Sequence, residues 1–206
     1  MKNAIEPLHD DSKSRGRLLG LAGRAGCGKS TIAQALVDRG LAQRVRFVGP
    51  LKDALVAMGL SREQVDGALK ETPSHLLCGA TPRHAMQTLG TEWGRNMIGP
   101  DVWVRLTMHR VDDLLASGVN VIVDDVRFDN EAEAIRERDG QLVTLVRGPV
   151  SAAAPERGLA ALWQRLRARV NGTHASEIGL TVRTVKVHND GTIADTVDEV
   201  LTWWNP

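Results

Sequence analysis

A glycine-rich segment that directly follows a short apolar run constrains this chain more than any other feature. Residues 23–30 read Gly-Arg-Ala-Gly-Cys-Gly-Lys-Ser, which is the spacing of a phosphate-binding P-loop. The apolar run over residues 18–22 is too short for a helix and predicts a buried strand, and residues 30–39 predict a helix that ends at Gly40. A loop between such a strand and helix directs backbone N–H groups at a phosphate. The segment therefore predicts nucleotide binding.

Short apolar segments alternate with helical ones along the rest of the chain. Four further strands are expected, over residues 45–48, 119–123, 142–146 and 185–187. Helices are expected from residue 51, after Ser61, after Thr81-Pro82, after Asp101, over 130–138 and up to Trp203. Buried strands separated by helices are typical of a parallel sheet covered on both faces. We therefore expect a three-layer α/β domain with about five parallel strands.

Composition limits the classes of protein to consider. The 206 residues carry 26 Lys and Arg against 25 Asp and Glu, which argues against a surface built throughout to hold nucleic acid. No apolar run approaches the ~18–20 residues that span a bilayer, so no membrane partner is expected. Cys27 and Cys78 are too few for a disulfide framework, which favours the cytoplasm. Residues 1–16 are expected to be a disordered tail and residues 17–206 a single domain.

Residue types at three strand ends suggest phosphoryl-transfer chemistry. In the loop, Lys29 would reach the β- and γ-phosphates and the Ser30 hydroxyl would ligate Mg²⁺. Asp124 and Asp125 end the expected third strand, at the edge where parallel sheets bind ligands. A carboxylate there can hold Mg²⁺ through water or accept a proton from a substrate. The alternative is that Asp125 caps the next helix while Arg127 pairs with Glu131.

One helix and one arginine-rich segment offer further candidates. Arg83, Gln87 and Thr91 would share a helix face, and Gly90 and Gly94 suggest close approach of another group, either a flat ligand or the protein itself. Lys52 follows the second strand, where a second phosphate could bind. Residues 147–169 hold five arginines and one acid. They suit a mobile lid (about 149–172), a plain basic helix or a polyanion-binding patch.

Together these segments resemble the deoxynucleoside monophosphate kinases of tailed bacteriophages. The matching stretches follow the family's order and are residues 23–30, 49–55, 83–92, 103–105, 125–131, 173–180 and 189–191. The resemblance implies a P-loop kinase fold with a helical lid, ATP and Mg²⁺ as cofactors, and a location in the host cytoplasm if the chain is phage-encoded. The connection before Arg83 is shorter and the lid segment longer than in the family, which leaves the accepted base open.

The resemblance also implies roles for individual residues. Catalysis would use Lys29, Asp125 and Arg127, and Mg²⁺ would use Ser30 and Asp124. ATP would contact Gly23, Ala25, Gly26, Cys27, Gly28, Lys29, Ser30, Thr31, Asn189 and Asp190. The deoxynucleoside monophosphate would contact Lys52, Arg83, Gln87, Gly90, Thr91, Trp103, Asp125, Arg127 and Glu131.

Three other functions remain open at this point, the weakest being a small-molecule kinase such as dephospho-coenzyme A kinase, which shares the P-loop and the Asn-Asp-Gly turn. A kinase of the same fold could phosphorylate a hydroxymethylated base, 5-hydroxymethyluracil, within phage DNA. It would need a general base, Asp124 or Asp125, and a basic groove, for which residues 147–169 are the candidate. A nucleotide-gated interaction module would need no second substrate site. The sequence also leaves open whether the chain forms a homodimer.

Overall fold

The central strand β1 (Leu18–Ala22) is built from apolar residues and one glycine, and all five are buried. The computed structural model describes residues 15–148 and 180–206, in which β1 is the middle strand of a five-stranded sheet. Its neighbours are β3 (Val121–Val126) and β4 (Gln141–Val146), and the outer strands are β2 (Gln43–Val45) and β5 (Val185–His188). The order is β2-β3-β1-β4-β5 and every pairing is parallel. The α/β prediction is therefore confirmed.

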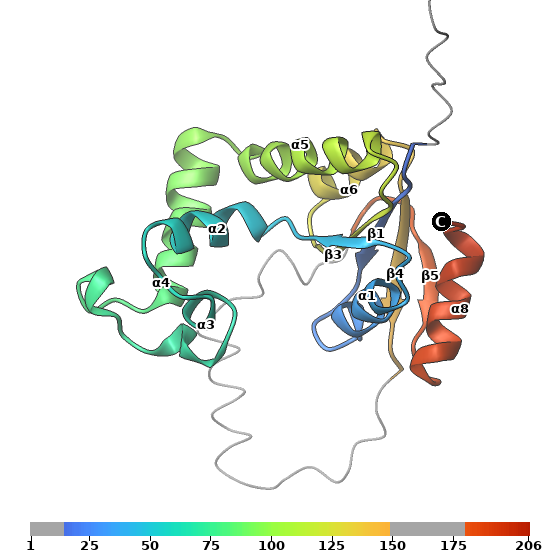
Figure 1. Ribbon diagram of the computed structural model, residues 1–206, viewed down its shortest axis with the longest axis horizontal. Coiled ribbons are helices and arrows are strands. Elements are labelled where there is room, and N and C mark those ends of the chain that lie inside the picture. Colours follow the sequence, from blue (N-terminus) through green and yellow to red (C-terminus); the bar gives the residue numbers. More distant parts are fainter. Residues whose placement is uncertain (1–14, 149–179) are drawn as a thin grey trace, which may run out of the picture.

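Helices pack on both faces of this sheet (Figure 1). On one face, α1 (Lys29–Asp38) and α8 (Ile193–Trp203) bury a cluster that includes Leu21, Leu36 and Trp204. On the other face, α5 (Val102–Ala116) and α6 (Asp129–Arg136) bury a cluster that includes Met108 and Ile135. The three layers follow from strands that are apolar on both sides. No helix in the described residues is long and apolar enough to cross a membrane.

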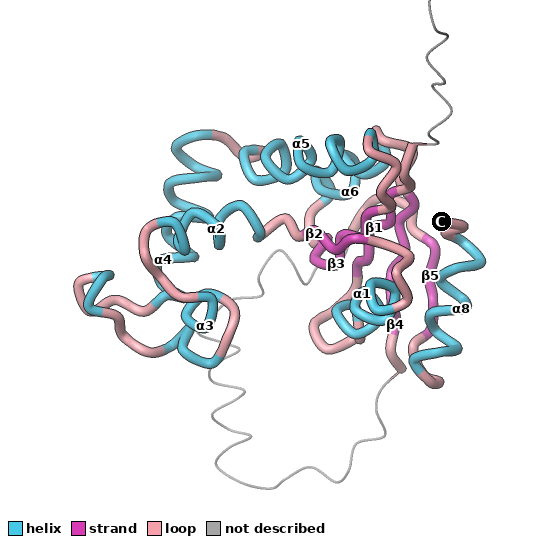
Figure 2. Tube along the Cα trace, viewed as in Figure 1, coloured by secondary structure: helices cyan, strands magenta, loops and turns pink. Residues whose placement is uncertain are grey.

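The chain between β2 and β3 forms a small helical lobe beside the sheet (Figure 2). The lobe packs around Leu51, Leu55, Leu60, Val65 and Trp103. Its elements are α2 (Gly49–Ala57), α3 (Arg62–Val65), the 3-10 turns η1 (Ala68–Glu71) and η2 (His75–Leu77), α4 (Pro82–Gln87) and the π-helical segment η3 (Thr88–Ile98). Ser61 starts α3 with the capping box that its sequence predicts. The lobe therefore has an apolar core of its own.

Strands β2 and β3 are displaced from the expected residues 45–48 and 119–123, and one helix differs in its winding. β2 ends at Val45 because the N–H groups of Phe47 and Val48 donate to Asp125 rather than to a strand. β3 begins at Val121 because the N–H of Val119 closes the end of α5 on the Leu114 carbonyl. The helix after Pro82 does not stay α-helical but winds as a π-helix from Thr88.

The glycines of η3 explain where its backbone lies. A Cβ on Gly94 would sit 2.5 Å from Nε1 of Trp103. That indole is 6% exposed, and its N–H donates to the Gly90 carbonyl at 2.8 Å. The group that approaches Gly90 and Gly94 is therefore the protein's own Trp103, together with Leu51, and the flat ligand suggested from the sequence is not needed to explain these glycines.

Gly94→Ala should lower the free energy of unfolding by about 1–3 kcal/mol, because a fixed indole cannot make room for the new methyl group. Urea denaturation followed by tryptophan fluorescence measures the change. The control is Asn96→Ala, an exposed position in the same segment, which should stay within about 0.5 kcal/mol of the parent. Equal stability of the Gly94 variant and the parent would show that Trp103 does not fix this segment.

Candidate active site

The loop between β1 and α1 adopts the conformation that its glycines predict. Gly23, Gly26 and Gly28 have φ angles of 133°, 79° and 99°, a region that residues with a side chain rarely adopt. A Cβ on Gly28 would also lie 2.2 Å from the side-chain nitrogen of Asn189. Ala25 and Gly26 are exposed at the loop's tip. The backbone is thus turned tightly at the N-terminus of α1, as phosphate binding requires.

Lys29 holds its ammonium group over this loop. Its Nζ donates to the carbonyl oxygens of Gly23 at 2.7 Å and Arg24 at 2.9 Å. Thr31 follows in the first turn of α1, and its side chain is exposed. A phosphate that bound the loop would offer Lys29 anionic oxygens in place of neutral carbonyls, which adds the attraction between opposite charges to each hydrogen bond.

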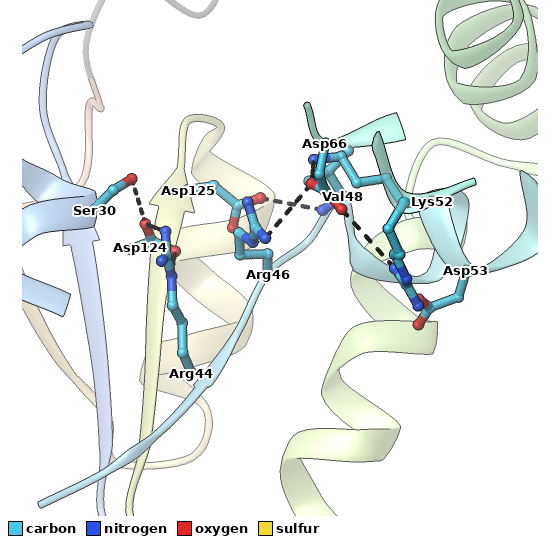
Figure 3. Close-up of polar contacts among 10 residues, drawn as sticks. Ser30, Arg44, Arg46, Val48, Lys52, Asp53, Asp66, Asp124 and Asp125 are labelled. Carbon is cyan, nitrogen blue, oxygen red and sulfur yellow. Dashed lines mark hydrogen bonds and ion pairs between the residues drawn. The ribbon is translucent and has the colours of Figure 1, made fainter. Parts of the chain in front are cut away.

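Ser30 and Asp124 meet beside the loop, as the sequence predicted for a metal site. The Ser30 hydroxyl donates to Oδ2 of Asp124 at 2.8 Å, and Asp124 is only 2% exposed. Arg44, on β2, contacts the same carboxylate: its Nε donates to Oδ1 at 2.9 Å and its Nη2 donates to Oδ2. Figure 3 shows Ser30 and Arg44 on either side of Asp124.

The donor set at this position suits Mg²⁺. A hydroxyl and a carboxylate are hard oxygen ligands, and Mg²⁺ usually takes one or two of these with water and phosphate completing its shell. Within residues 15–148 and 180–206, no group of three or more His, Cys, Asp or Glu side chains lies close enough to bind a metal alone. A metal here would therefore depend on nucleotide phosphates for much of its coordination.

Asp125 points away from Asp124 and joins the sheet to the lobe. Its carboxylate accepts the N–H of Phe47 at 2.9 Å and of Val48 at 3.1 Å, so it clamps the turn before α2 (Figure 3). Burial raises the pKa of Asp125 above its ordinary value, and the two N–H groups oppose that rise. The clamp places the start of α2, with Lys52 in its first turn, beside the end of β3.

Glu131 organises the loop that carries Arg127. Its Oε2 accepts the N–H of Arg127 at 2.7 Å and of Phe128 at 3.1 Å. Arg95 of η3 reaches Oε1 at 3.4 Å and stacks over the Phe128 ring at 4.4 Å. Burial raises the pKa of Glu131 to about 7. The alternative in which the side chains of Arg127 and Glu131 pair at the surface does not hold, because Glu131 is 3% exposed and binds backbone groups.

Arg127 and the phosphate loop line the same cavity, which has a volume of about 480 Å³. Its wall includes the loop itself, Arg127 from the end of β3, and Arg147 and Gly148 from the end of β4. The guanidinium groups therefore border the space in which phosphates at the loop would lie. The lid expected over residues 149–172 lies outside the described residues.

A second, smaller cleft of about 140 Å³ lies where β2 meets the lobe. Five cationic side chains line it against two carboxylates, Asp53 and Asp66. Lys52 pairs with Asp66 at 2.5 Å. Thr107 also lines the cleft, and its Oγ1 is buried without a hydrogen-bond partner in the described residues. The four arginines of this basic cleft are Arg44, Arg46, Arg62 and Arg110.

The other residues expected to contact the acceptor lie in two different environments, some exposed on the lobe and others packed inside it. Arg83, Gln87 and Thr91 are all exposed, but the π-helical winding from Thr88 removes the regular i, i+4 stripe. Arg83 pairs with Glu71 of the lobe. Trp103 packs in the lobe core and bonds to Gly90, so both residues shape η3 from within.

Asn189 and Asp190, expected beside ATP, follow β5. They form hydrogen bonds to the phosphate loop and to Gly148 after β4. The Asn189 side chain donates to the Cys27 carbonyl at 2.8 Å and accepts the Thr196 hydroxyl at 2.9 Å. Asp190 accepts the N–H of Gly148 at 2.7 Å. Cys27 itself is 4% exposed and packs in the core. Asn189 therefore supports the phosphate loop from behind through a backbone contact.

Sequence reasoning did not select Arg44 on β2, Arg46 directly after it, or their partners. The two arginines flank the buried Val45 with a spacing of two residues, and both line the cleft. That period of two was the available signal. Asp66, Arg62, Arg110 and Thr107 carried none, because they join the cleft only through the packing of the lobe.

Two sequence comparisons point to one family of kinases. A sequence model of the family described as deoxynucleotide monophosphate kinase matches residues 79–160. A protein of Acanthamoeba polyphaga mimivirus, named "Putative deoxynucleotide monophosphate kinase", is 30% identical over 203 residues, which cover 90% of this chain and 94% of that protein.

Solved structures show the same fold at low sequence identity. The APS kinase of Mycobacterium tuberculosis, solved with AMPPNP and APS, is 16% identical, with 93% of this chain and 99% of that chain covered and a TM-score of 0.50. The dephospho-CoA kinase of Campylobacter jejuni is 14% identical, with 90% and 94% covered and a TM-score of 0.50. Both are P-loop kinases, which confirms the fold class.

Glu131 should make stability depend on pH. Its pKa rises from an ordinary 4.5 to about 7 on folding, so between these values the unfolded chain releases a proton that the folded chain keeps. The free energy of unfolding should therefore fall as pH rises from 4.5 to 7, by about 3 kcal/mol from this group. Urea titrations across this range should show a shallower fall for Glu131→Gln than for the parent.

The control is Glu133→Gln, an exposed glutamate on the same helix, which should keep the parent's pH dependence. Parallel curves for the parent and Glu131→Gln would contradict the raised pKa.

Proposed function

This chain belongs to the deoxynucleotide monophosphate kinase family, and from that premise we propose that it transfers the γ-phosphoryl group of ATP to a deoxynucleoside 5′-monophosphate. The products are ADP and the deoxynucleoside diphosphate. The observation that supports this most is the arrangement at the end of β3. Asp124 faces the phosphate loop, Asp125 clamps the lobe that carries Lys52, and Arg127 borders the cavity at the loop.

ATP is assigned to the loop of residues 23–30. Backbone N–H groups at the N-terminus of α1 would bind the phosphates, and Lys29 would exchange its two carbonyl partners for phosphate oxygens. Ser30 and Asp124 would hold Mg²⁺, which when bound neutralises charge on the β- and γ-phosphates. Asn189 keeps the loop in this shape through the Cys27 carbonyl.

The acceptor is assigned to the lobe side of β3. Lys52, which lines the basic cleft, and Arg83 on α4 would hold its 5′-phosphate, and exposed Gln87 and Thr91 would contact the base. Gly90 and Trp103 would act by holding η3 in position, since they bond to each other. Glu131 would keep the Arg127 loop in place.

The chemistry needs positioning more than proton transfer. The attacking oxygen belongs to a phosphate that is already anionic, so no strong general base is required. Both oxygens of Asp125 are occupied by backbone N–H groups, which suits a positioning role. Arg127 and Lys29 would stabilise the negative charge of the group in transit, and such contacts commonly supply 10²–10³ in rate.

Lys29→Ala and Arg127→Ala should each lower kcat/KM by about a hundredfold or more, because each removes a cation from the transferring phosphoryl group. ADP formation is measured with Mg²⁺ and ATP against dAMP, dGMP, dCMP, dTMP, hydroxymethylated dUMP and duplex DNA that contains this base. The matched control is Arg39→Ala, a surface arginine paired with Asp198, which should retain the parent's activity.

Turnover restricted to the modified DNA would contradict the proposal and favour the kinase that acts on DNA. That rival places its basic groove in residues 147–169, of which the structure describes only Arg147 and Gly148. Slow ATP hydrolysis without any acceptor dependence would instead favour a nucleotide-gated interaction module.

A further inference from the structure

Arg44 belongs to both polar sites of the molecule. Its side chain lines the basic cleft where β2 meets the lobe, and its guanidinium is bonded to Asp124 beside the phosphate loop. Among the described residues, Asp124 is the only ionic partner of Arg44. A single side chain therefore connects the position assigned to Mg²⁺ with the cleft that contains Lys52.

The contact with Asp124 competes with metal binding. Asp124 receives Ser30 and two guanidinium nitrogens, so three of its roughly four acceptor positions are already in use. Asp124 is 2% exposed, so screening by water between a guanidinium and a nearby divalent cation would be weak. While Arg44 remains bonded to Asp124, a hydrated cation at Ser30 has fewer acceptor positions of Asp124 to use. The positive guanidinium beside it also repels the cation.

The basic cleft offers Arg44 another partner when an anion enters it. Arg46, Lys52, Arg62 and Arg110 already share the two carboxylates of the cleft, whereas neither carboxylate binds Arg44. The Thr107 hydroxyl, buried and without a partner among the described residues, lines the same space. A phosphate there can take two parallel hydrogen bonds from a guanidinium.

We propose that Arg44 couples the two substrates: the phosphate of the acceptor draws Arg44 off Asp124 and so makes Asp124 available to the metal. The acceptor's identity in this statement rests on the function proposed above. Arg44 is a positioning residue, since it acts on the metal through Asp124. Coupling between two binding equilibria is reciprocal, so the metal strengthens anion binding by the same factor.

The test measures metal affinity rather than turnover. Mn²⁺ replaces Mg²⁺ and is followed by electron paramagnetic resonance on the full-length protein saturated with AMPPNP. Sulfate is the anion probe, with chloride at equal ionic strength as its reference. In the parent, sulfate should tighten Mn²⁺ binding about tenfold, within the usual range for coupled sites.

Three variants separate coupling from structural support. Arg44→Gln should bind Mn²⁺ about as tightly without sulfate as the parent does with it, and sulfate should then add nothing. Arg44→Lys, which cannot form the two-pronged contact, should fall between the two. The matched control is Arg138→Gln: Arg138 makes a two-pronged contact with Asp112, and its side chain is 20% exposed against 22% for Arg44.

Arg138→Gln should lose stability but keep the parent's Mn²⁺ affinity and sulfate response. If Arg44→Gln does not fold because Asp124 is left unpaired, the parent and Arg44→Lys decide the question. No sulfate effect in the parent, or weaker Mn²⁺ binding in either Arg44 variant, would overturn the proposal. Coupling without turnover of any monophosphate would refute the proposed function alone, and turnover without coupling would refute this inference alone.

Discussion

The adjacent carboxylates at the end of β3 are the constraint on which the rest of the structure depends. Successive side chains of a strand point to opposite sides. Asp124 therefore reaches Ser30 and Arg44, whereas Asp125 reaches the backbone of Phe47 and Val48. One strand end thereby fixes the helix of the phosphate loop and the entry to the helical lobe. Burying two carboxylates is costly unless donors surround them, and each has such donors. Because their side chains point to opposite sides of β3, Asp124 and Asp125 connect the phosphate loop and the helical lobe to the same strand.

This link bears on how the domain could hold two phosphates for transfer. The reaction requires donor and acceptor phosphates to be held in line, with cations around the group in transit. The sheet supplies the fixed element, because β1 and β3 are buried over almost their whole length. The cations proposed for this role come from separate elements: Lys29 from α1, Arg127 from the turn after β3, and Lys52 from α2. Glu131 and Asn189 act behind this surface, holding two of the loops by backbone contacts.

Local patterns predicted the fold and part of the site, and tertiary contacts decided the rest. The P-loop spacing and the apolar run before it were sufficient for β1, α1 and the positions of Lys29 and Ser30. The pair Asp124 and Asp125 was also predictable from its place at a strand end. The winding of η3 was not, because it depends on the indole of Trp103 seated against Gly94. The basic cleft was missed for a similar reason: Asp66 meets Arg46 and Lys52, and Thr107 lines the same cleft, only once the lobe has packed.

The most direct test of the central claim is a crystal structure with Mg²⁺, a non-hydrolysable ATP analogue and the preferred deoxynucleoside monophosphate. The account predicts the analogue's phosphates on the backbone of residues 23–30 and the metal beside Ser30 and Asp124. It predicts the acceptor's phosphate on the lobe side of β3, with Asp125 still bound to Phe47 and Val48. An acceptor found elsewhere, such as in the groove between α5 and α6, would contradict the account, and so would a metal bound away from Asp124. Either result would show that Asp124 and Asp125 do not have the separate roles proposed for them.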